Sequence, residues 1–399
     1  MDYRFSGRMN KLSGSATREI LKLIKRGGVI SFAGGLPAAD MLPAAELAAV
    51  SDEILNSPRV KEIMQYDVTE GAPEVRAEIA EYLGDFGIHG IGADHVQIIS
   101  GGQQGIDLSC RALLDKGDYA LVEDPTYLAA LQIITSYEAV PVGVKAVSDG
   151  LDLNDLEAKI KKYNPKLLYV VPTFSNPTGG TYSAENRKRI AEITAKYNIV
   201  VVEDDPYAKL RFSGSAVPSI KSMDTAGNVI YLTSFSKIVS PGMRIGAACA
   251  APELLGRMTV CKQGIDVHTN SLAVAVIGEF LKRGIIKRHV EKVLPIYKKK
   301  QKLIVECLDK YFPDCYRHTN PEGGLFIWGK FEDAKLDTQA LLPEAIETCK
   351  AAYVQGNVFY ADGSGHDCIR LNFSNPSESD IERGIEALGR FFKSKIQSK

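Results

Sequence analysis

Residues 234–246 read Ser-Phe-Ser-Lys-Ile-Val-Ser-Pro-Gly-Met-Arg-Ile-Gly, and they follow a short apolar run, Val229 to Leu232. Such a run is typical of a buried strand, so the polar segment is expected at the carboxyl end of that strand. Lys237 has two serines just before it and Arg244 shortly after it. Hydroxyls and a guanidinium suit a dianionic phosphate. A desolvated pocket with nearby cations keeps a lysine amine unprotonated, as Schiff-base chemistry requires. The segment therefore predicts a reactive lysine beside a phosphate site.

The pattern of a buried strand followed by polar residues recurs along the central part of the chain. Helical spacing of Ile, Leu and Ala separates these strands, as in Leu153 to Tyr163 and Ala184 to Tyr197. Strands that alternate with helices predict βαβ units and a mostly parallel sheet. Ligands bind at the carboxyl ends of the strands in such sheets, so distant segments are expected to meet there. The expected strands are Val96 to Ile99, Tyr119 to Val122, Leu167 to Val171, Ile199 to Val202, Val229 to Leu232 and Ala247 to Ala250.

The two ends of the chain have a different pattern, which indicates a second domain. A helix is expected at Arg18 to Lys25, and a long charged helix begins after Gly284. Short strands are expected near residues 324–328 and 368–373. We therefore predict an α/β fold with a large domain around a mostly parallel sheet and a smaller α+β domain. The expected parts are an N-terminal arm, 1–44, that packs on the small domain, the large domain, 45–285, and the C-terminal small domain, 286–399.

Composition and charge exclude several classes of protein. The chain has 399 residues, 45% hydrophobic and 24% charged, which is typical of a globular protein. Its net charge of −1 provides no broad field for nucleic acid or anionic lipid. No apolar run reaches membrane-spanning length, and the N-terminus does not read as a signal peptide. The seven cysteines are scattered without a C-x-x-C pair, so neither disulfides nor a metal site are expected, and a reduced cytoplasmic protein is favoured.

Two glycine-containing turns follow predicted strands. Ser100 to Gly105 joins a strand to a helix, where glycines and free N–H groups let the backbone approach an anion. A plain strand-to-helix turn is the alternative. Ser175 to Gly180 forms a turn that projects the Asn176 amide, which can donate to a phenolic oxygen. An ordinary Asx turn explains this second segment equally well.

Two further strand ends carry an aromatic residue or a run of acids. Tyr127 follows the strand that begins at Tyr119, and it either stacks on a flat heteroaromatic ring or belongs to the core. Glu203-Asp204-Asp205 ends a very apolar strand, where charge is costly unless it is paired. A protonated ring nitrogen would pair with one of these carboxylates. A cluster of helix N-caps is the alternative.

With these segments, the chain resembles the class I and II aminotransferases of pyridoxal-phosphate fold type I. It is particularly similar to the branch of 2-aminoadipate and kynurenine aminotransferases, over nearly the whole chain from about Thr17 to Pro376. The resemblance implies a large domain with a mostly parallel sheet of the seven-stranded type and pyridoxal 5′-phosphate as the cofactor. Further matching motifs are Thr17 to Leu23, Ser31 to Pro37, Gln65-Tyr66, Thr69 to Gly71, Pro321 to Trp328 and Ile369 to Ser374.

The resemblance implies a role for each matching position that faces the cofactor. Lys237 would bind the cofactor covalently and act as the catalytic acid and base. Asp204 would pair with the protonated ring nitrogen, Tyr207 and Asn176 would bond the phenolic oxygen, and Tyr127 would stack on the ring. The phosphate would be held by Gly102, Gln103, Ser234, Ser236 and Arg244, with Tyr66 reaching the phosphate of a neighbouring subunit in a homodimer.

The implied substrate contacts are fewer. Arg370 would bind the α-carboxylate, with help from Asn176 and the Gly35 backbone. Arg18 either meets an acidic substrate side chain or is a solvated helix residue. The sequence also departs from the family at Gly102, where relatives often have serine, at Asp67-Val68 in place of Gly-Pro, and at residues 357–363, which lack the usual Pro-Gly.

The expected function is amino-group transfer between an L-amino acid and a 2-oxo acid such as 2-oxoglutarate, with ping-pong kinetics. Glutamate, 2-aminoadipate, aromatic and large aliphatic amino acids are the expected donors. β-Elimination of C–S bonds is an alternative that uses the same cofactor contacts. A regulator with an aminotransferase-like domain is disfavoured, because few residues precede the first motif and no basic DNA-binding segment is evident. No nucleic acid or membrane partner is expected.

Overall fold

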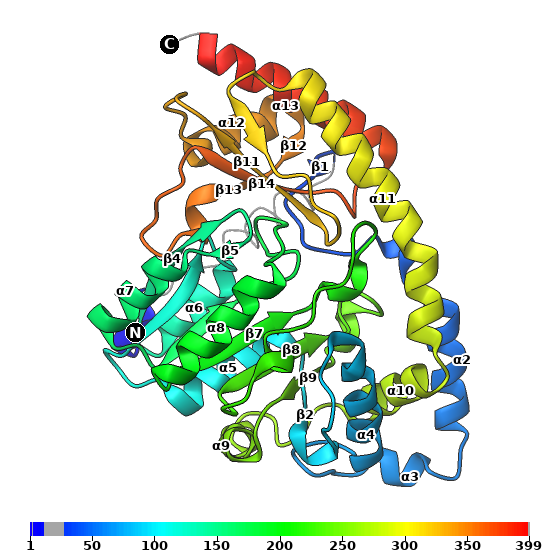
Figure 1. The fold of residues 1–399 in the computed structure, drawn as a ribbon. Helices are drawn as coiled ribbons and strands as arrows, with labels where there is room; N and C mark the ends of the chain where they lie inside the picture. The colour runs from blue at the N-terminus through cyan, green and yellow to red at the C-terminus, as the bar shows by residue number, and fades with distance from the viewer. Residues whose placement is uncertain (2, 12–27, 398–399) are drawn as a thin grey trace.

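The computed structural model describes residues 1, 3–11 and 28–397, in which helices cover a large sheet and a second sheet lies nearer the C-terminus (Figure 1). The helix expected at Arg18 to Lys25 lies outside the described residues. The large sheet has the strand order β2-β9-β8-β7-β6-β3-β4-β5. Its strands are β2 Val96–Ile99, β3 Tyr119–Asp124, β4 Val140–Val147, β5 Gly150–Leu151, β6 Leu167–Val170, β7 Val200–Asp205, β8 Val229–Ser234 and β9 Gly246–Cys249.

The large sheet is mostly parallel, as the sequence predicts. Strands β4, β3, β6, β7 and β8 pair in parallel, whereas β9 runs antiparallel to both β8 and β2. All six predicted strands are present, and the seven-stranded sheet is extended by the two-residue β5, which pairs with β4. Strand β4 was not predicted from the sequence. It lies towards the sheet edge and buries only Val144 fully, so it lacks the continuous apolar run of a central strand.

Helices cover both faces of the large sheet. On one face, α7 and α8 contribute Leu156, Ile160 and Ile190 to a core with Leu168 and Val201. On the other face, α5 packs against β7, β8 and β9 and contacts α6 and α9. The predicted helices in Leu153 to Tyr163 and Ala184 to Tyr197 are confirmed. These helices are α5 Gly102–Leu113, α6 Leu128–Ser136, α7 Leu153–Tyr163, α8 Ala184–Lys196 and α9 Pro252–Gln263.

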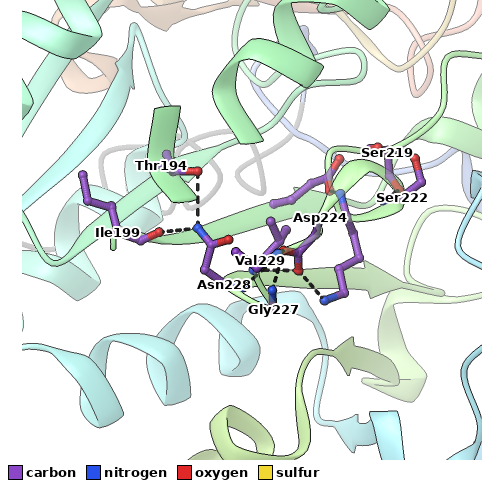
Figure 2. A network of polar contacts seen from close by, with 11 residues as sticks. Thr194, Ile199, Ser219, Ser222, Asp224, Gly227, Asn228 and Val229 are labelled. Atoms are coloured by element: carbon purple, nitrogen blue, oxygen red, sulfur yellow. Dashed lines mark hydrogen bonds and ion pairs between the residues drawn. The ribbon is translucent and has the colours of Figure 1, made fainter. Parts of the chain in front are cut away.

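A partly buried turn holds the start of β8, the strand that leads to Lys237. The Asp224 carboxylate accepts hydrogen bonds from the backbone N–H groups of Gly227 at 2.8 Å and Val229 at 3.1 Å. Asn228 donates from its side chain to the Ile199 carbonyl at 2.7 Å, which ties this turn to the start of β7. Figure 2 shows these groups converging on one turn. The two central strands are therefore held in register at the end opposite the site.

A smaller antiparallel sheet with the order β10-β11-β14-β13 is built from the C-terminal part of the chain. Helix α11 runs along one side of the molecule and joins the region of α2 and α10 to α13 (Figure 1). The long charged helix expected after Gly284 is confirmed. The remaining helices and strands are β1 Ile30–Ser31, α2 Ala44–Leu55, α3 Val60–Ile63, α4 Pro73–Tyr82, α10 Ser271–Lys282, α11 Ile285–Tyr311, β10 Tyr316–His318, β11 Phe326–Phe331, α12 Thr338–Cys349, β12 Ala351–Ala352, β13 Val354–Gln355, β14 Cys368–Asn372 and α13 Glu378–Gln397.

The segment before α2 packs against the C-terminal part. Strand β1 pairs in parallel with β12, and the Phe32 carbonyl accepts from the Asn372 N–H at 2.8 Å. The Ser374 hydroxyl donates to the Leu36 carbonyl at 2.8 Å, which holds the glycine-rich residues 34–37 beside β14. All seven cysteines are free. Within the described ranges, every helix is too short or too polar to cross a membrane.

Candidate functional site

A cavity of about 500 Å³ lies at the carboxyl ends of β7 and β8 and receives most of the predicted site residues. Helices α5 and α6 begin beside it, and β14 contributes from the smaller sheet. Tyr66 does not line this cavity, and Arg18 lies outside the described residues. The predicted residues that line it are Gly35, Gly102, Gln103, Tyr127, Asn176, Asp204, Tyr207, Ser234, Ser236, Lys237, Arg244 and Arg370.

The Lys237 amine is held in a buried, cation-rich position. Its Nζ donates a hydrogen bond to the Gly35 carbonyl at 2.8 Å. Burial lowers its pKa to about 8, and the positive charges of Arg244 and Arg370 act in the same direction. The amine therefore loses its proton at a lower pH than an exposed lysine does, which favours a role as nucleophile or general base.

The three consecutive acids form the end of β7, which extends to Asp205 rather than stopping at the predicted Val202. Because side chains alternate across a strand, the three carboxylates have different surroundings. Glu203 accepts from two backbone N–H groups at 2.8 Å, those of Ile220 and Lys221. Asp205 accepts from the Ala208 N–H at 3.0 Å, but the N-cap residue of the short helix Ala208–Leu210 is Tyr207, so the alternative of an N-cap cluster is not supported. Only Asp204 of the three lines the cavity.

Asp204 is a buried carboxylate with a single partner among the described residues. The Tyr169 hydroxyl donates to its Oδ2 at 2.8 Å. Burial raises the pKa of Asp204 to about 7, whereas the Tyr169 bond and the charge of Lys237 lower it. A cationic group in the cavity would therefore gain a strong partner in Asp204.

One end of the cavity gathers hydroxyls and a guanidinium. Ser234 Oγ and Ser236 Oγ are 3.0 Å apart, and Arg244 Nη1 donates to Ser236 Oγ at 3.4 Å. Arg244 Nη2 donates to the Ser100 carbonyl at 3.1 Å. A Cβ at Gly101 would lie 2.4 Å from Arg244 Nη2, and Gly101 has φ of +87°, so glycine is required there. With the N-terminus of α5 beside it, this arrangement suits a phosphate.

Arg370 is a buried cation without a carboxylate partner among the described residues. Its side chain is 2% exposed and stacks over Phe326, with the guanidinium carbon 4.3 Å from the ring centre. Nη1 donates to Asn176 Oδ1 at 2.8 Å and Nη2 to the Ala33 carbonyl at 2.6 Å, whereas Nε has no hydrogen-bond partner. Burial lowers the pKa of Arg370 to about 10, so the group remains charged at neutral pH. Such a group is suited to an anionic ligand.

The phenolic groups near the cavity are held neutral by burial. Burial raises the pKa of Tyr127 and that of Tyr207, and the Asn176 side chain is hydrogen-bonded to Tyr207. Tyr127 precedes α6 as its N-cap residue. Both residues therefore provide neutral aromatic or hydroxyl contacts rather than charge.

Two buried networks beside the cavity were not identified from the sequence. Glu123 accepts from the Tyr182 hydroxyl at 2.7 Å, the Ser175 hydroxyl at 3.0 Å and the Val171 N–H at 3.1 Å. This network holds the turn that carries Asn176. Tyr169 forms the second network with Asp204. The position of Tyr169 inside the apolar run of β6 was the one feature of the sequence that could have indicated this contact, because a buried phenol needs a polar partner.

Tyr66 lies on a different surface. Its side chain is 81% exposed, and its ring is 5.9 Å from that of His268 in an edge-on arrangement. The neighbouring surface exposes further apolar side chains, namely Met64 and Val68.

Comparison with known proteins identifies related sequences and structures. The sequence model for aminotransferase class I and II matches residues 29–388. Aromatic-amino-acid aminotransferase 1 of Thermococcus litoralis is 34% identical and covers 100% of this chain and 96% of its own. A crystal structure of Pyrococcus horikoshii kynurenine aminotransferase with PMP is 36% identical, with a TM-score of 0.93 over 98% of this chain and 97% of that one. The Thermus thermophilus α-aminoadipate aminotransferase, complexed with N-(5′-phosphopyridoxyl)-L-leucine, is 35% identical, with a TM-score of 0.91 over 99% and 98%.

Proposed function

This chain belongs to the aminotransferase class I and II family, and we propose that it transfers an amino group from an L-amino acid to a 2-oxo acid such as 2-oxoglutarate by a ping-pong mechanism. It is an enzyme that uses pyridoxal 5′-phosphate. The observation that carries the proposal is the charge around one cavity. Lys237, Arg244 and Arg370 line it, and Asp204 is the one acid among its described lining residues.

The residues around the cavity fit the cofactor. Ser234, Ser236, Arg244 and the backbone N–H groups of Gly102 and Gln103 supply donors for its phosphate. Asp204 offers a buried carboxylate to the protonated ring nitrogen. Tyr207 and Asn176 supply donors for the phenolic oxygen, and Tyr127 supplies an aromatic face.

The cofactor, when bound, supplies an electron sink that makes the α-proton of the substrate acidic. Lys237 Nζ, which holds the cofactor in the resting enzyme, accepts that proton and delivers it again during the transfer. Asp204 keeps a proton on the ring nitrogen. Arg370 binds the α-carboxylate, for which its unpartnered Nε is available, and Asn176 and the Gly35 backbone support this contact.

The substrate range is proposed to include aromatic and large aliphatic amino acids together with glutamate and 2-aminoadipate. Leu36, Leu128 and Phe326 give the cavity apolar walls, which favours the first group. The three described cations of the cavity already have roles: Arg244 binds the phosphate, Arg370 binds the α-carboxylate, and Lys237 transfers the proton. An acidic substrate side chain therefore needs another cation, and Arg18 is the candidate.

A panel of amino donors tested against 2-oxoglutarate, compared by kcat/KM, tests this function. Formation of glutamate with loss of the donor amino group supports it. Pyruvate and ammonia released without any acceptor would identify a C–S β-lyase instead. For Arg18→Ala, we expect kcat/KM to fall for acidic donors and to stay near the wild-type value for aromatic donors. Equal losses on both would remove the role of Arg18.

We also propose a homodimer in which Tyr66 reaches the phosphate bound by the partner. Three observations support this arrangement: Tyr66 is exposed, it does not line the cavity of its own subunit, and apolar residues lie beside it. A cytoplasmic location is proposed from the seven free cysteines, which suit a reducing compartment.

A further inference from the structure

Tyr169 is a phenol buried in the centre of the large sheet. Its side chain is 1% exposed, and its hydroxyl donates to Asp204 Oδ2 at 2.8 Å. Within the described ranges, this bond is the only one made by either side chain. A buried hydroxyl without a partner is destabilising, and phenylalanine would fill the same space. Binding this carboxylate is therefore the one interaction that the hydroxyl provides in the described structure.

The strand register explains why the two side chains meet. Tyr169 of β6 pairs with Val202 of β7, and Asp204 lies two residues further along β7 on the same face. Residues placed diagonally on one face are within reach of a long aromatic side chain. The contact is thus set by the parallel register of two central strands.

The two oxygens of Asp204 have different environments. Oδ2 is bound by Tyr169, whereas Oδ1 lies on the side of the α5 N-terminus, where a Cβ added to Gly102 would be 3.4 Å away. Asp204 and Gly102 both line the cavity, but Tyr169 does not. Tyr169 therefore binds Oδ2 from outside the cavity, and Oδ1 remains available to a ligand in the cavity.

We propose that Tyr169 is a positioning residue that fixes the Asp204 carboxylate and keeps the proton of the aspartate–pyridine pair on the ring nitrogen. The inference rests on the proposed function, in which Asp204 pairs with that nitrogen. A hydrogen bond donated to Oδ2 disperses the carboxylate charge and makes Oδ1 a weaker base. Burial raises the pKa of Asp204, and Asp205 also raises it, whereas Tyr169 and Lys237 lower it. Loss of the hydroxyl would move the shared proton from the ring nitrogen to the carboxyl group.

The chain contains a matched control for this pair. The Tyr231 hydroxyl donates to Asp205 Oδ2 at 3.1 Å, and both residues are fully buried. Neither lines the cavity. Tyr231→Phe therefore removes the same kind of bond on neighbouring strands without touching Asp204. Any general effect of losing a buried tyrosine–aspartate bond appears in both variants.

The test uses the holoenzyme loaded with pyridoxal 5′-phosphate labelled with ¹⁵N in the ring. The ¹⁵N chemical shift reports protonation of the ring nitrogen directly, whatever the activity. For Tyr169→Phe, we expect the midpoint of ring-nitrogen deprotonation to fall by about one pH unit or more, the size of one hydrogen bond to a charged group. We expect Tyr231→Phe to match the wild type. A midpoint in Tyr169→Phe equal to that of Tyr231→Phe would overturn the proposal.

A second substitution works in the opposite direction and avoids any loss of packing. Incorporation of 3,5-difluorotyrosine at position 169 gives a more acidic phenol and hence a stronger donor to Asp204. The midpoint should then rise above that of the wild type, and an unchanged or lower midpoint would contradict the inference. In kinetic terms, Tyr169→Phe should lower kcat roughly tenfold or more with little change in KM.

Asp204→Asn distinguishes a failure of the proposed role of Asp204 from a failure of the role of Tyr169 alone. If it leaves the ring nitrogen signal unchanged, the proposed role of Asp204 fails, and the role of Tyr169 fails with it. If Asp204→Asn removes the protonated signal while Tyr169→Phe behaves like the control, only the role of Tyr169 is wrong.

Discussion

At the scale of the single residue, the low pKa of Lys237 is the property on which the proposed chemistry depends. We expect covalent capture of pyridoxal 5′-phosphate by the apoenzyme to rise with pH, with its midpoint near pH 8. The sign follows from burial, which disfavours the ammonium form, so the reactive free amine appears at lower pH than in an exposed lysine. Borohydride trapping followed by mass spectrometry measures the yield at each pH.

Lys237→Ala provides the control for this titration. It should retain non-covalent binding of the cofactor but give no trapped product and no turnover. A yield that rises only near pH 10 in the wild type would show that the amine is not perturbed. A trapped product in Lys237→Ala would place the reactive amine elsewhere.

A second residue-scale prediction concerns the buried Glu123. Burial raises its pKa to about 8, above the value near 4.5 that applies in an unfolded chain. The folded state therefore binds more protons between these values, so stability is greatest at the acidic end and falls as pH rises towards 8. In Glu123→Gln, the free energy of unfolding should fall less steeply with rising pH than in the wild type. The difference between the two slopes is at most about 1.4 kcal/mol per pH unit, the value for one proton. The Tyr182 hydroxyl can then accept from the new amide.

Urea unfolding between pH 5 and pH 9 measures this slope. Glu185→Gln, on the exposed surface of α8, is the control and should follow the wild-type slope. Identical slopes in all three proteins would show that Glu123 is ionised in the folded protein throughout.

At the scale of the element, the turn before β8 shows how a strand is held in place. The Asp224 side chain is 1% exposed and accepts from Lys221 Nζ at 2.8 Å as well as from four backbone N–H groups. Asp224→Ala leaves these donors without a partner and should lower the free energy of unfolding by about 3 kcal/mol. Asp224→Asn keeps one acceptor oxygen and should cost less. A loss below about 1 kcal/mol for Asp224→Ala, measured by urea unfolding, would contradict this role.

Prediction from the sequence succeeded for elements whose residue pattern depends on that element alone. The central strands were found because burial on both faces makes them continuously apolar, as in Leu167 to Val170. Strand β4 was missed because its exposed edge position gives a mixed pattern. The bond between Tyr169 and Asp204 could not be predicted, because it depends on the register of two strands and joins residues that lie 35 positions apart in the sequence.

The candidate site divides in the same way. Residues that follow a strand, such as Lys237 and Asn176, were singled out because their segments had recognisable turn or charge patterns. Glu123 was not singled out, because its role needs Tyr182 and Ser175, which approach only in the folded chain. Contacts of this kind between distant residues do not change the local spacing of apolar residues, so the sequence pattern does not indicate them.

At the scale of the whole molecule, we propose three parts: the arm 1–44, the large domain 45–285 and the small domain 286–399. The pairing of β1 with β12 supports packing of the arm on the small domain. Arg370 on β14 faces the same cavity as Asp204 on β7, so the proposed site lies between the two domains. Binding of a substrate carboxylate to Arg370 would thus link the domains across the site.

The proposed dimer makes a sharper prediction, because each site needs Lys237 of one subunit and Tyr66 of the other. Lys237→Ala should be inactive, and Tyr66→Ala should bind the cofactor more weakly through loss of a phosphate contact. When the two variants are unfolded together and refolded, the mixed dimers contain one site with an intact lysine and an intact tyrosine. Activity at limiting cofactor should therefore exceed the sum of the separately refolded variants. A double variant that carries both changes on one chain, mixed with Lys237→Ala, is the control and should restore nothing, since neither chain then has an intact lysine.

 If Tyr66 served its own subunit, the intact lysine in a mixed dimer would still sit beside an alanine at position 66, and mixing would restore nothing. Recovery therefore reports exchange of Tyr66 across the interface, and it should grow with the fraction of mixed dimers, as measured by native mass spectrometry. Mixed dimers that form in quantity without recovered activity would contradict a site shared between two subunits. If the recovered activity is proportional to the amount of mixed dimer, each mixed dimer contains one complete site.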